Sequence, residues 1–210
     1  MDFITLHGIG QSSYFGRIFV GLSKITKAGR ISPPQAGKFS ESVHGQTGKH
    51  RHGLMIFKAV EADGVQINDI TARAGVFNQV EVDCVAELWQ DYLTYGVPDC
   101  GYNFIVEREG DKVLGFACHG PRDLTQGVHD LYWIAVDPET RRGGVGRRLL
   151  TASEEAVRQS GGRMLIAETS GTPHYESTRK FYVGMGYQAE ASIKDFYSQG
   201  DDLVIFVKRL

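Results

Sequence analysis

Apolar residues recur at helical spacing in several stretches of the chain and predict amphipathic helices. In the first, 78–95, they return every three or four positions, and Gly96 and Pro98 follow as stop signals. The predicted helices are 78–95, a stretch from Val145 to the pair Gly161-Gly162, and a stretch holding Thr178, Phe181, Tyr182 and Met185, with one or two further turns at Asn68–Ala74.

Shorter runs rich in β-branched and aromatic residues predict strands. They are Met55–Val60, Tyr102–Glu107, Lys112–Cys118, Leu131–Val136, Met164–Ala167 and two closing strands near 187–196 and 202–209. The run Leu131–Val136 is nearly all apolar, so we expect it to be buried on both faces of a sheet. The order β, α, α, β, β, β, α, β, α, β, β predicts an α/β fold with a sheet of mixed strand direction.

Composition is that of a soluble globular protein, with 41% hydrophobic and 23% charged residues. A net charge of −2 gives no reason to expect nucleic acid as a partner. No run of roughly 18 apolar residues predicts a membrane-spanning helix. Cys84, Cys100 and Cys118 are odd in number and widely spaced, which favours neither a disulfide framework nor a zinc site and makes the cytoplasm the expected compartment.

Charge divides the chain into two unequal parts. Residues 1–53 carry seven Lys and Arg against Asp2 and Glu41, a balance of 7 − 2 = +5, whereas the remainder carries −7. The first part is rich in Gly, Ser and Lys, so we predict a basic, disordered tail that is dispensable for catalysis, ahead of a domain at 54–210. A transit peptide, or a functional start at Met55, is the alternative.

Three glycines stand among four arginines in Arg-Arg-Gly-Gly-Val-Gly-Arg-Arg, 141–148, between a buried strand and a helix. The first N–H groups of a helix have no intrahelical partner, and the helix dipole makes that end positive. Glycine lets the backbone approach a ligand, and arginine adds donors suited to phosphate oxygens. The pattern therefore predicts a pyrophosphate site; the alternative is a glycine-rich turn before a solvated helix.

Two other nucleotide motifs fit less well. A dinucleotide fold needs Gly-x-Gly-x-x-Gly, but Leu149 occupies the third glycine position, and only about 40 residues follow Glu168, ending in an antiparallel pair. A P-loop needs Gly-Lys-Ser/Thr, which is missing.

The segments 131–138 and 141–150 together resemble the acetyl-coenzyme A binding segment of the GNAT superfamily of N-acetyltransferases, whose signature is Arg/Gln-x-x-Gly-x-Gly/Ala. The stretch 175–187 is similar to that family's second motif, a helix carrying a tyrosine and ending in Gly-Phe or Gly-Tyr. Tyr175 and Thr178 stand where that motif usually has Asn and Ala. The resemblance covers about 55–210.

The resemblance implies a largely antiparallel, twisted sheet with a central pair of splayed parallel strands, flanked by helices. The pantetheine arm of acetyl-coenzyme A would enter between the splayed strands, and a bulge near Ala135 would free backbone N–H groups, that of Val136 pointing at the acetyl carbonyl. The cofactor-binding residues implied are Ile134, Ala135, Val136, Arg141, Arg142, Gly143, Gly144, Val145, Gly146 and Arg147. No metal is expected.

For proton transfer, Tyr182 matches the family's general acid near the sulfur; a core tyrosine is the alternative. Asp130 resembles a carboxylate that some family members carry at the start of the equivalent strand, which implies a general base; an aspartate that satisfies a turn is the alternative. Glu168, at the end of its strand, is a rival general base. His129 and His174 are weaker candidates, and acidic residues around the closing turn could recognise a cationic substrate or be merely solvated, namely Asp195, Asp201 and Asp202.

The sequence thus predicts an N-acetyltransferase that moves acetyl from acetyl-coenzyme A to a primary amine of a small molecule or amino acid by direct attack. A protein or peptide acceptor is the alternative within this class. A non-catalytic module that binds coenzyme A as a sensor is the alternative outside it. The expected partner is a small amine, with no nucleic acid or membrane, and a homodimer is compatible with the sequence.

Overall fold

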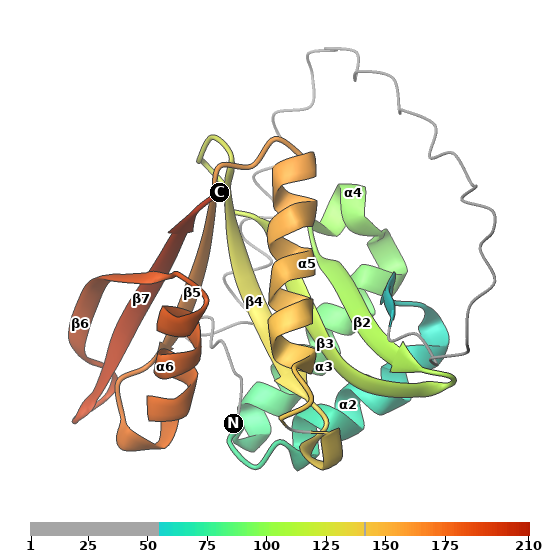
Figure 1. Cartoon of the computed structure of the whole chain (residues 1–210), viewed down its shortest axis with the longest axis horizontal. Coiled ribbons are helices and arrows are strands. Elements are labelled where there is room, and N and C mark those ends of the chain that lie inside the picture. The colour runs from blue at the N-terminus through green and yellow to red at the C-terminus, as the bar shows by residue number, and fades with distance from the viewer. Residues whose placement is uncertain (1–54, 141) are drawn as a thin grey trace. The chain divides into compact units, whose positions relative to one another are not determined.

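The computed structural model describes residues 55–140 and 142–210. Leu54 and Arg141 lie outside the described residues, as does the predicted tail at 1–53. The disorder of that tail and its dispensability for catalysis therefore stay predictions. Element labels follow Figure 1.

Seven strands form one sheet in the order β1-β2-β3-β4-β5-β7-β6. They are β1 (Met55–Lys58), β2 (Asn103–Glu109), β3 (Lys112–Pro121), β4 (Val128–Val136), β5 (Met164–Ser170), β6 (Gln188–Ser198) and β7 (Asp201–Arg209). All neighbours pair antiparallel except β4 and β5, which are parallel. The predicted fold class, a mixed and largely antiparallel sheet, is confirmed.

Helices cover both faces of this sheet (Figure 1). They are α2 (Gly64–Arg73), α3 (Gln79–Tyr95), α4 (Val97–Cys100), α5 (Val145–Gln159) and α6 (Glu176–Gly184), with 3-10 turns at Glu61–Asp63, Pro138–Thr140 and Pro173–Tyr175. One hydrophobic core joins α2 and α3 to the sheet, and a second joins α5 and α6 to its other face. Burying a separate apolar stripe on each face produces this three-layer arrangement.

Several boundaries differ from the sequence prediction for local reasons. Strand β4 begins at Val128, three residues early, because the polar residues His129 and Asp130 pair with β3 on one side and β5 on the other. Pro98 does not simply end structure after α3; it occupies the first turn of α4, where its missing N–H costs no hydrogen bond. Cys100 is the last residue of this short helix.

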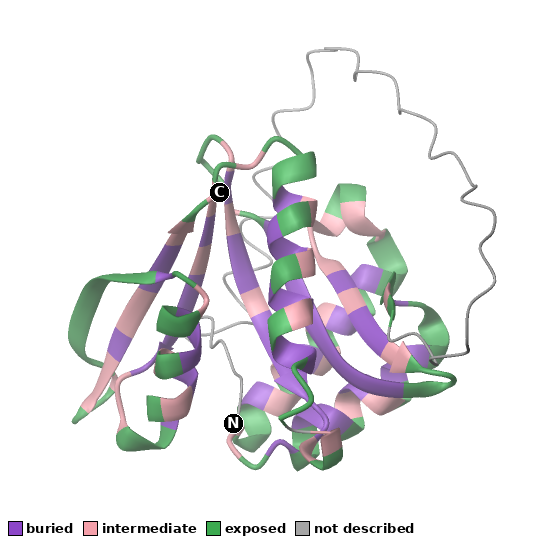
Figure 2. Ribbon diagram, in the orientation of Figure 1, coloured by how far each residue is buried: buried purple, intermediate pink, exposed green. Residues whose placement is uncertain are grey.

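Strand β6 is the least buried part of the sheet. It lies at the sheet edge, and its residues are exposed almost throughout (Figure 2), whereas β3 and β4 are buried along nearly their whole length. The core of the domain therefore lies around the central strands, where the candidate site is found.

Candidate active site

Strands β4 and β5 pair at only three positions and then separate. The parallel partners are Val128 with Met164, His129 with Leu165, and Asp130 with Ile166. Beyond these pairs β4 continues to Val136 and β5 to Ser170, and Figure 1 shows the two strands diverging as a V. The predicted splay is present, with its closed end at Asp130.

The β4 segment inside the V contains Ile134, Ala135 and Val136, all buried. The predicted bulge near Ala135 is wrong in position. Ala135 pairs regularly with Phe116, and the irregularity comes earlier, where Cys118 pairs with Trp133 but His119 pairs with Leu131. Tyr132 is thus the extra residue, and its ring packs against Tyr102 at 5.3 Å between centroids. A bulky aromatic contact, invisible in a strand pattern, accompanies the bulge.

The glycine loop leads from β4 into α5. Gly144 has φ +77°, the left-handed conformation that glycine adopts without strain, and it is the N-cap of α5. The N–H of Arg148 donates to the Gly144 carbonyl at 3.1 Å, which is the first hydrogen bond of the helix. The preceding N–H groups of Val145, Gly146 and Arg147 therefore point out of the helix end. Arg141 lies outside the described residues.

Arg148 holds this loop in place, a role that the sequence pattern did not reveal. Its guanidinium makes a forked contact with the fully buried Glu107 carboxylate of β2, with nitrogen–oxygen distances of 2.7–3.1 Å. It also donates to the Gly143 carbonyl at 2.8 Å. Gly143 in turn donates its N–H to Thr140 at 3.3 Å, so its N–H is used within the loop. The pairing of Glu107 with Arg148, 41 residues apart, has no local signature.

Asp130 and Glu168, the two candidate bases, lie together at the closed end of the V. Both are buried, and Arg122 bridges them, with Nη1 at 3.0 Å from Asp130 Oδ1 and 3.4 Å from Glu168 Oε1. The structure therefore brings the two rivals into one cluster. Arg122 has no recognisable sequence signal, because it lies in a loop between β3 and β4 without any motif.

Tyr182 is fully buried in the second core. Its ring contacts Phe181, Tyr187 and Phe206 with centroids 5.5 Å apart. Burial raises the pKa of Tyr182 well above its ordinary value, so the hydroxyl keeps its proton at neutral pH. This is the protonation state that a general acid needs, and the packing is also that of a core tyrosine.

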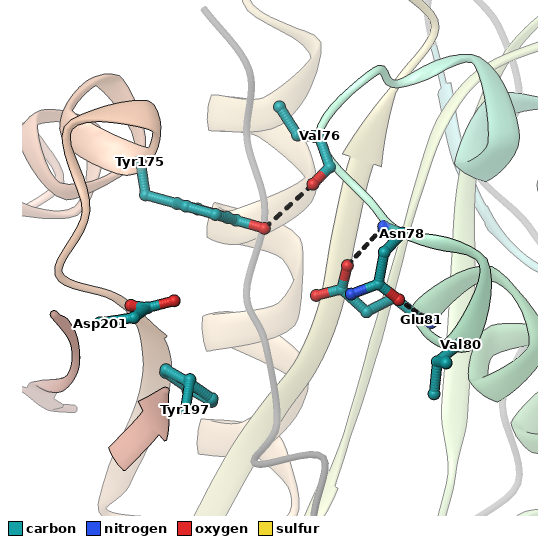
Figure 3. A pocket seen from close by; sticks show the side chains of 7 residues that line it. All are labelled: Val76, Asn78, Val80, Glu81, Tyr175, Tyr197 and Asp201. Atoms are coloured by element: carbon teal, nitrogen blue, oxygen red, sulfur yellow. Dashed lines mark hydrogen bonds between the residues drawn. The ribbon is translucent and has the colours of Figure 1, made fainter. Parts of the chain in front are cut away.

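A cavity of about 430 Å³ lies between the start of α3 and the turn from β6 to β7 (Figure 3). Its lining residues are Val76, Asn78, Val80, Glu81, Tyr175, Tyr197 and Asp201. Figure 3 shows Tyr175 reaching across it, and its hydroxyl donates to the Val76 carbonyl at 3.1 Å. The cavity carries two carboxylates and two aromatic rings, which is suited to a cationic ligand.

Of the three acids at the closing turn, Asp201 lines this cavity. The other two stabilise the turn itself: Asp202 accepts from the N–H of Asp195 at 3.0 Å, and Asp195 accepts from the N–H of Gly200 at 2.6 Å. His174 packs edge-on against Tyr175. His129 lines a different cavity, of about 330 Å³, beneath the C-terminal end of α5.

Within 55–140 and 142–210, no cluster of three or more His, Cys, Asp or Glu side chains is arranged to hold a metal ion. In the same residues, no helix combines the length and apolar character required to cross a membrane.

Comparison with known proteins decides the family. Residues 100–189 match the family model described as acetyltransferase (GNAT) domain. A crystal structure from Desulfovibrio desulfuricans, assigned to the GNAT family of acetyltransferases, superposes with a TM-score of 0.73 at 39% identity, over 75% of this chain and 99% of that one. The chain belongs to the GNAT family. The predicted family and enzyme class, an acyltransferase, are confirmed.

Two more proteins are similar to this GNAT domain, one in fold and one in part of its sequence. A Salmonella typhimurium protein crystallised with acetyl-coenzyme A shares the fold, with a TM-score of 0.60 at 19% identity over 75% of this chain and 94% of that one. The amino-acid acetyltransferase of Pseudomonas putida is 33% identical over 106 residues, 50% of this chain. The match covers only 24% of that enzyme's length.

Proposed function

We propose that this domain transfers acetyl from acetyl-coenzyme A to a primary amine of a small molecule by direct attack. The observation that carries the proposal is the V between β4 and β5, which opens beside the start of α5. The first N–H groups of that helix have no hydrogen-bond partner within the helix. Diverging parallel strands next to an anion-binding helix end are the backbone arrangement that a cofactor with a diphosphate and an extended thioester arm requires.

The residues around the V fit acetyl-coenzyme A, which supplies an activated acetyl thioester. The N–H groups of Val145, Gly146 and Arg147 would hold the diphosphate, and the exposed side chains of Arg142 and Arg147 would add positive charge. The buried segment Ile134–Val136 would offer backbone donors to the thioester oxygen, on which negative charge develops during attack.

The acceptor amine has an ordinary pKa of roughly 10, so it must lose a proton before attack. We assign this step to Glu168, because its contact to Arg122 is longer than that of Asp130 and leaves it less tightly bound to the cation. Asp130 anchors Arg122 instead. Tyr182 donates a proton to the departing sulfur as the carbon–nitrogen bond forms and the carbon–sulfur bond breaks.

The cavity beside Tyr175 supports a small acceptor. Its volume of about 430 Å³ is in the range of small-molecule sites, and the Tyr175–Val76 hydrogen bond crosses it. The similarity to an amino-acid acetyltransferase supports a small amine as well. Cys100 and Cys118 form no disulfide among the described residues, which is usual in the reducing cytoplasm, and we keep that compartment as our expectation.

The proposal is tested by measuring coenzyme A release from acetyl-coenzyme A over a panel of amines, amino acids and peptides. Direct attack predicts intersecting initial-velocity patterns and no acetylated protein in the mass spectrum after incubation with acetyl-coenzyme A alone. Tight binding of coenzyme A without thiol release for any acceptor would instead support a non-catalytic binding module. Preference for peptides over small amines would move the acceptor to the protein class.

A further inference from the structure

The acceptor cavity, which lies beside Tyr175, contains two carboxylates, Glu81 and Asp201. Among residues 55–140 and 142–210, neither Glu81 nor Asp201 forms an ion pair with a Lys or Arg. Glu81 is 4% exposed and accepts from the Asn78 N–H at 2.6 Å, while Asp201 accepts from the Ser170 hydroxyl at 2.6 Å. Apart from Glu81, each buried carboxylate of the described residues, Glu107 and Asp137 among them, has an Arg or Lys beside it.

The pKa shifts of Glu81 and Tyr197 agree with carboxylates that have no Lys or Arg beside them among the described residues. Burial raises the pKa of Glu81, against the hydrogen bond from Asn78, and the charge of Asp201 adds to the rise. Burial is also the main cause of the raised pKa of Tyr197, to which the charges of Glu168, Asp201 and Glu81 contribute. The charges of the candidate base Glu168 and of the two cavity carboxylates therefore all raise the pKa of the same hydroxyl, that of Tyr197.

Aromatic and polar groups complete the lining. The Tyr197 hydroxyl is buried and has no hydrogen-bond partner among the described residues, while the Tyr175 ring spans the cavity (Figure 3). A buried hydroxyl and two carboxylate groups offer acceptors to an N–H donor, and aromatic faces attract a cation. Together they provide what an ammonium or guanidinium group requires when it leaves water.

We propose that the acceptor carries a second cationic group, which Glu81 and Asp201 bind in this cavity while the amine to be acetylated faces Glu168. The inference rests on the proposed acetyl transfer and specifies its substrate class: diamines and similarly dicationic compounds. A carboxylate at the far end of the acceptor would lie beside two negative charges, so simple anionic acceptors are disfavoured.

Three acceptors of equal chain length test the idea on the full chain: 1,5-diaminopentane, pentylamine and 5-aminopentanoate. They place a cation, a neutral methyl and an anion at the end opposite the reacting amine. A hydrogen bond to a charged group favours the diamine over pentylamine by about 10- to 100-fold in kcat/KM. The anionic acceptor should be the slowest of the three.

Variants connect this preference to the cavity. Asp201→Asn and Glu81→Gln should each lower the ratio of kcat/KM for diamine over pentylamine by about tenfold. Glu81→Gln keeps an oxygen that can accept from Asn78 N–H, so the start of α3 should hold. Glu87→Gln, which removes a charge from the exposed side of the same helix, is the matched control and should leave the ratio unchanged.

Equal rates for the three acceptors, or a ratio that survives both cavity variants, would overturn the inference while leaving acetyl transfer standing. If no amine is acetylated, the proposed function fails separately. Calorimetry then decides the inference, which requires that 1,5-diaminopentane binds the wild-type protein more tightly than pentylamine and that Asp201→Asn removes the difference.

Discussion

The glycine loop draws its groups from one continuous stretch of the chain, whereas the acceptor cavity draws its groups from places as far apart as Val76 and Asp201. The loop offers mainly backbone N–H groups, whose direction is set by a helix start and one left-handed glycine. The cavity offers side chains. The contrast suggests that cofactor binding depends on backbone conformation and acceptor choice on side-chain charge, so that the two can be altered separately.

The largest effect is expected at Tyr182. Tyr182→Phe keeps the buried ring but removes the proton that we assign to the departing sulfur, so kcat should fall by about 10²- to 10⁴-fold with little change in cofactor affinity. The loss should shrink for a thioester whose thiol is more acidic. Unchanged single-turnover rates would make Tyr182 a core residue only.

The second largest effect is expected at Arg148, which holds the glycine loop in place. Arg148→Met leaves the buried Glu107 without its cation, and removing one partner of a buried ion pair costs about 3–5 kcal/mol of unfolding free energy. Because the Arg148 side chain is itself 37% exposed, we expect a loss at or below the lower end of that range. Denaturant unfolding measures the loss. The double variant Glu107→Met with Arg148→Met should recover much of the stability but not the cofactor affinity, because the contact to Gly143 is still missing. Full recovery of affinity would show that Arg148 does not position the loop.

A third region should affect neither site. His119 lies 3% exposed in the cavity beneath the C-terminal end of α5, and burial, with the charge of His129, lowers its pKa to about 4. Because this pKa lies below the unfolded value of about 6.5, the unfolded chain binds a proton more readily as the pH falls. Stability is therefore complete above pH 6.5 and declines toward pH 4, by about 3 kcal/mol from this group.

His119→Phe should flatten that part of the pH dependence, measured by denaturant unfolding at several pH values. Its coenzyme A affinity and acceptor preference at pH 7.5 should match those of the wild type. A variant with the same pH dependence as the wild type would show that other groups dominate acid unfolding.

The smallest effect is expected for a substitution in the glycine loop, and it concerns cofactor affinity. Gly144→Val should weaken acetyl-coenzyme A binding by about tenfold, which is roughly 1.4 kcal/mol, because a β-branched residue avoids φ near +77° and the helix start must shift. Gly110→Val is the matched control: Gly110 has φ +61° in the β2–β3 hairpin with nothing nearby. Gly144→Val should lose more stability than Gly110→Val, because a Cβ at Gly144 would lie 2.9 Å from Arg148 Nη1. Calorimetry should find weaker binding only in Gly144→Val.

Sequence reasoning reached the elements that depend on local signals. Helical periodicity placed α3, α5 and α6, and the Gly-x-Gly pattern located the helix start, because both signals lie within a few residues. The sequence did not predict the roles of Arg122, Arg148 or Glu81, because these depend on contacts with distant segments. The bulge was expected at Ala135 by resemblance and is at Tyr132, since it is accompanied by aromatic packing with Tyr102 rather than by a local motif.

The three parallel pairs between β4 and β5 also bear on how the sheet forms and opens. All other strand pairings of the described residues lie within β1–β4 or within β5–β7. The pairs from Val128–Met164 to Asp130–Ile166, with the adjoining hydrogen bond from the Arg163 N–H to the Gly127 carbonyl at 2.7 Å, therefore form the backbone seam between two antiparallel halves. Parallel pairing needs a long crossover, here through α5, and such contacts close late in folding. Each half can keep its own ladder while this seam opens, so its amides should exchange with solvent hydrogen sooner than those of β3 or β7.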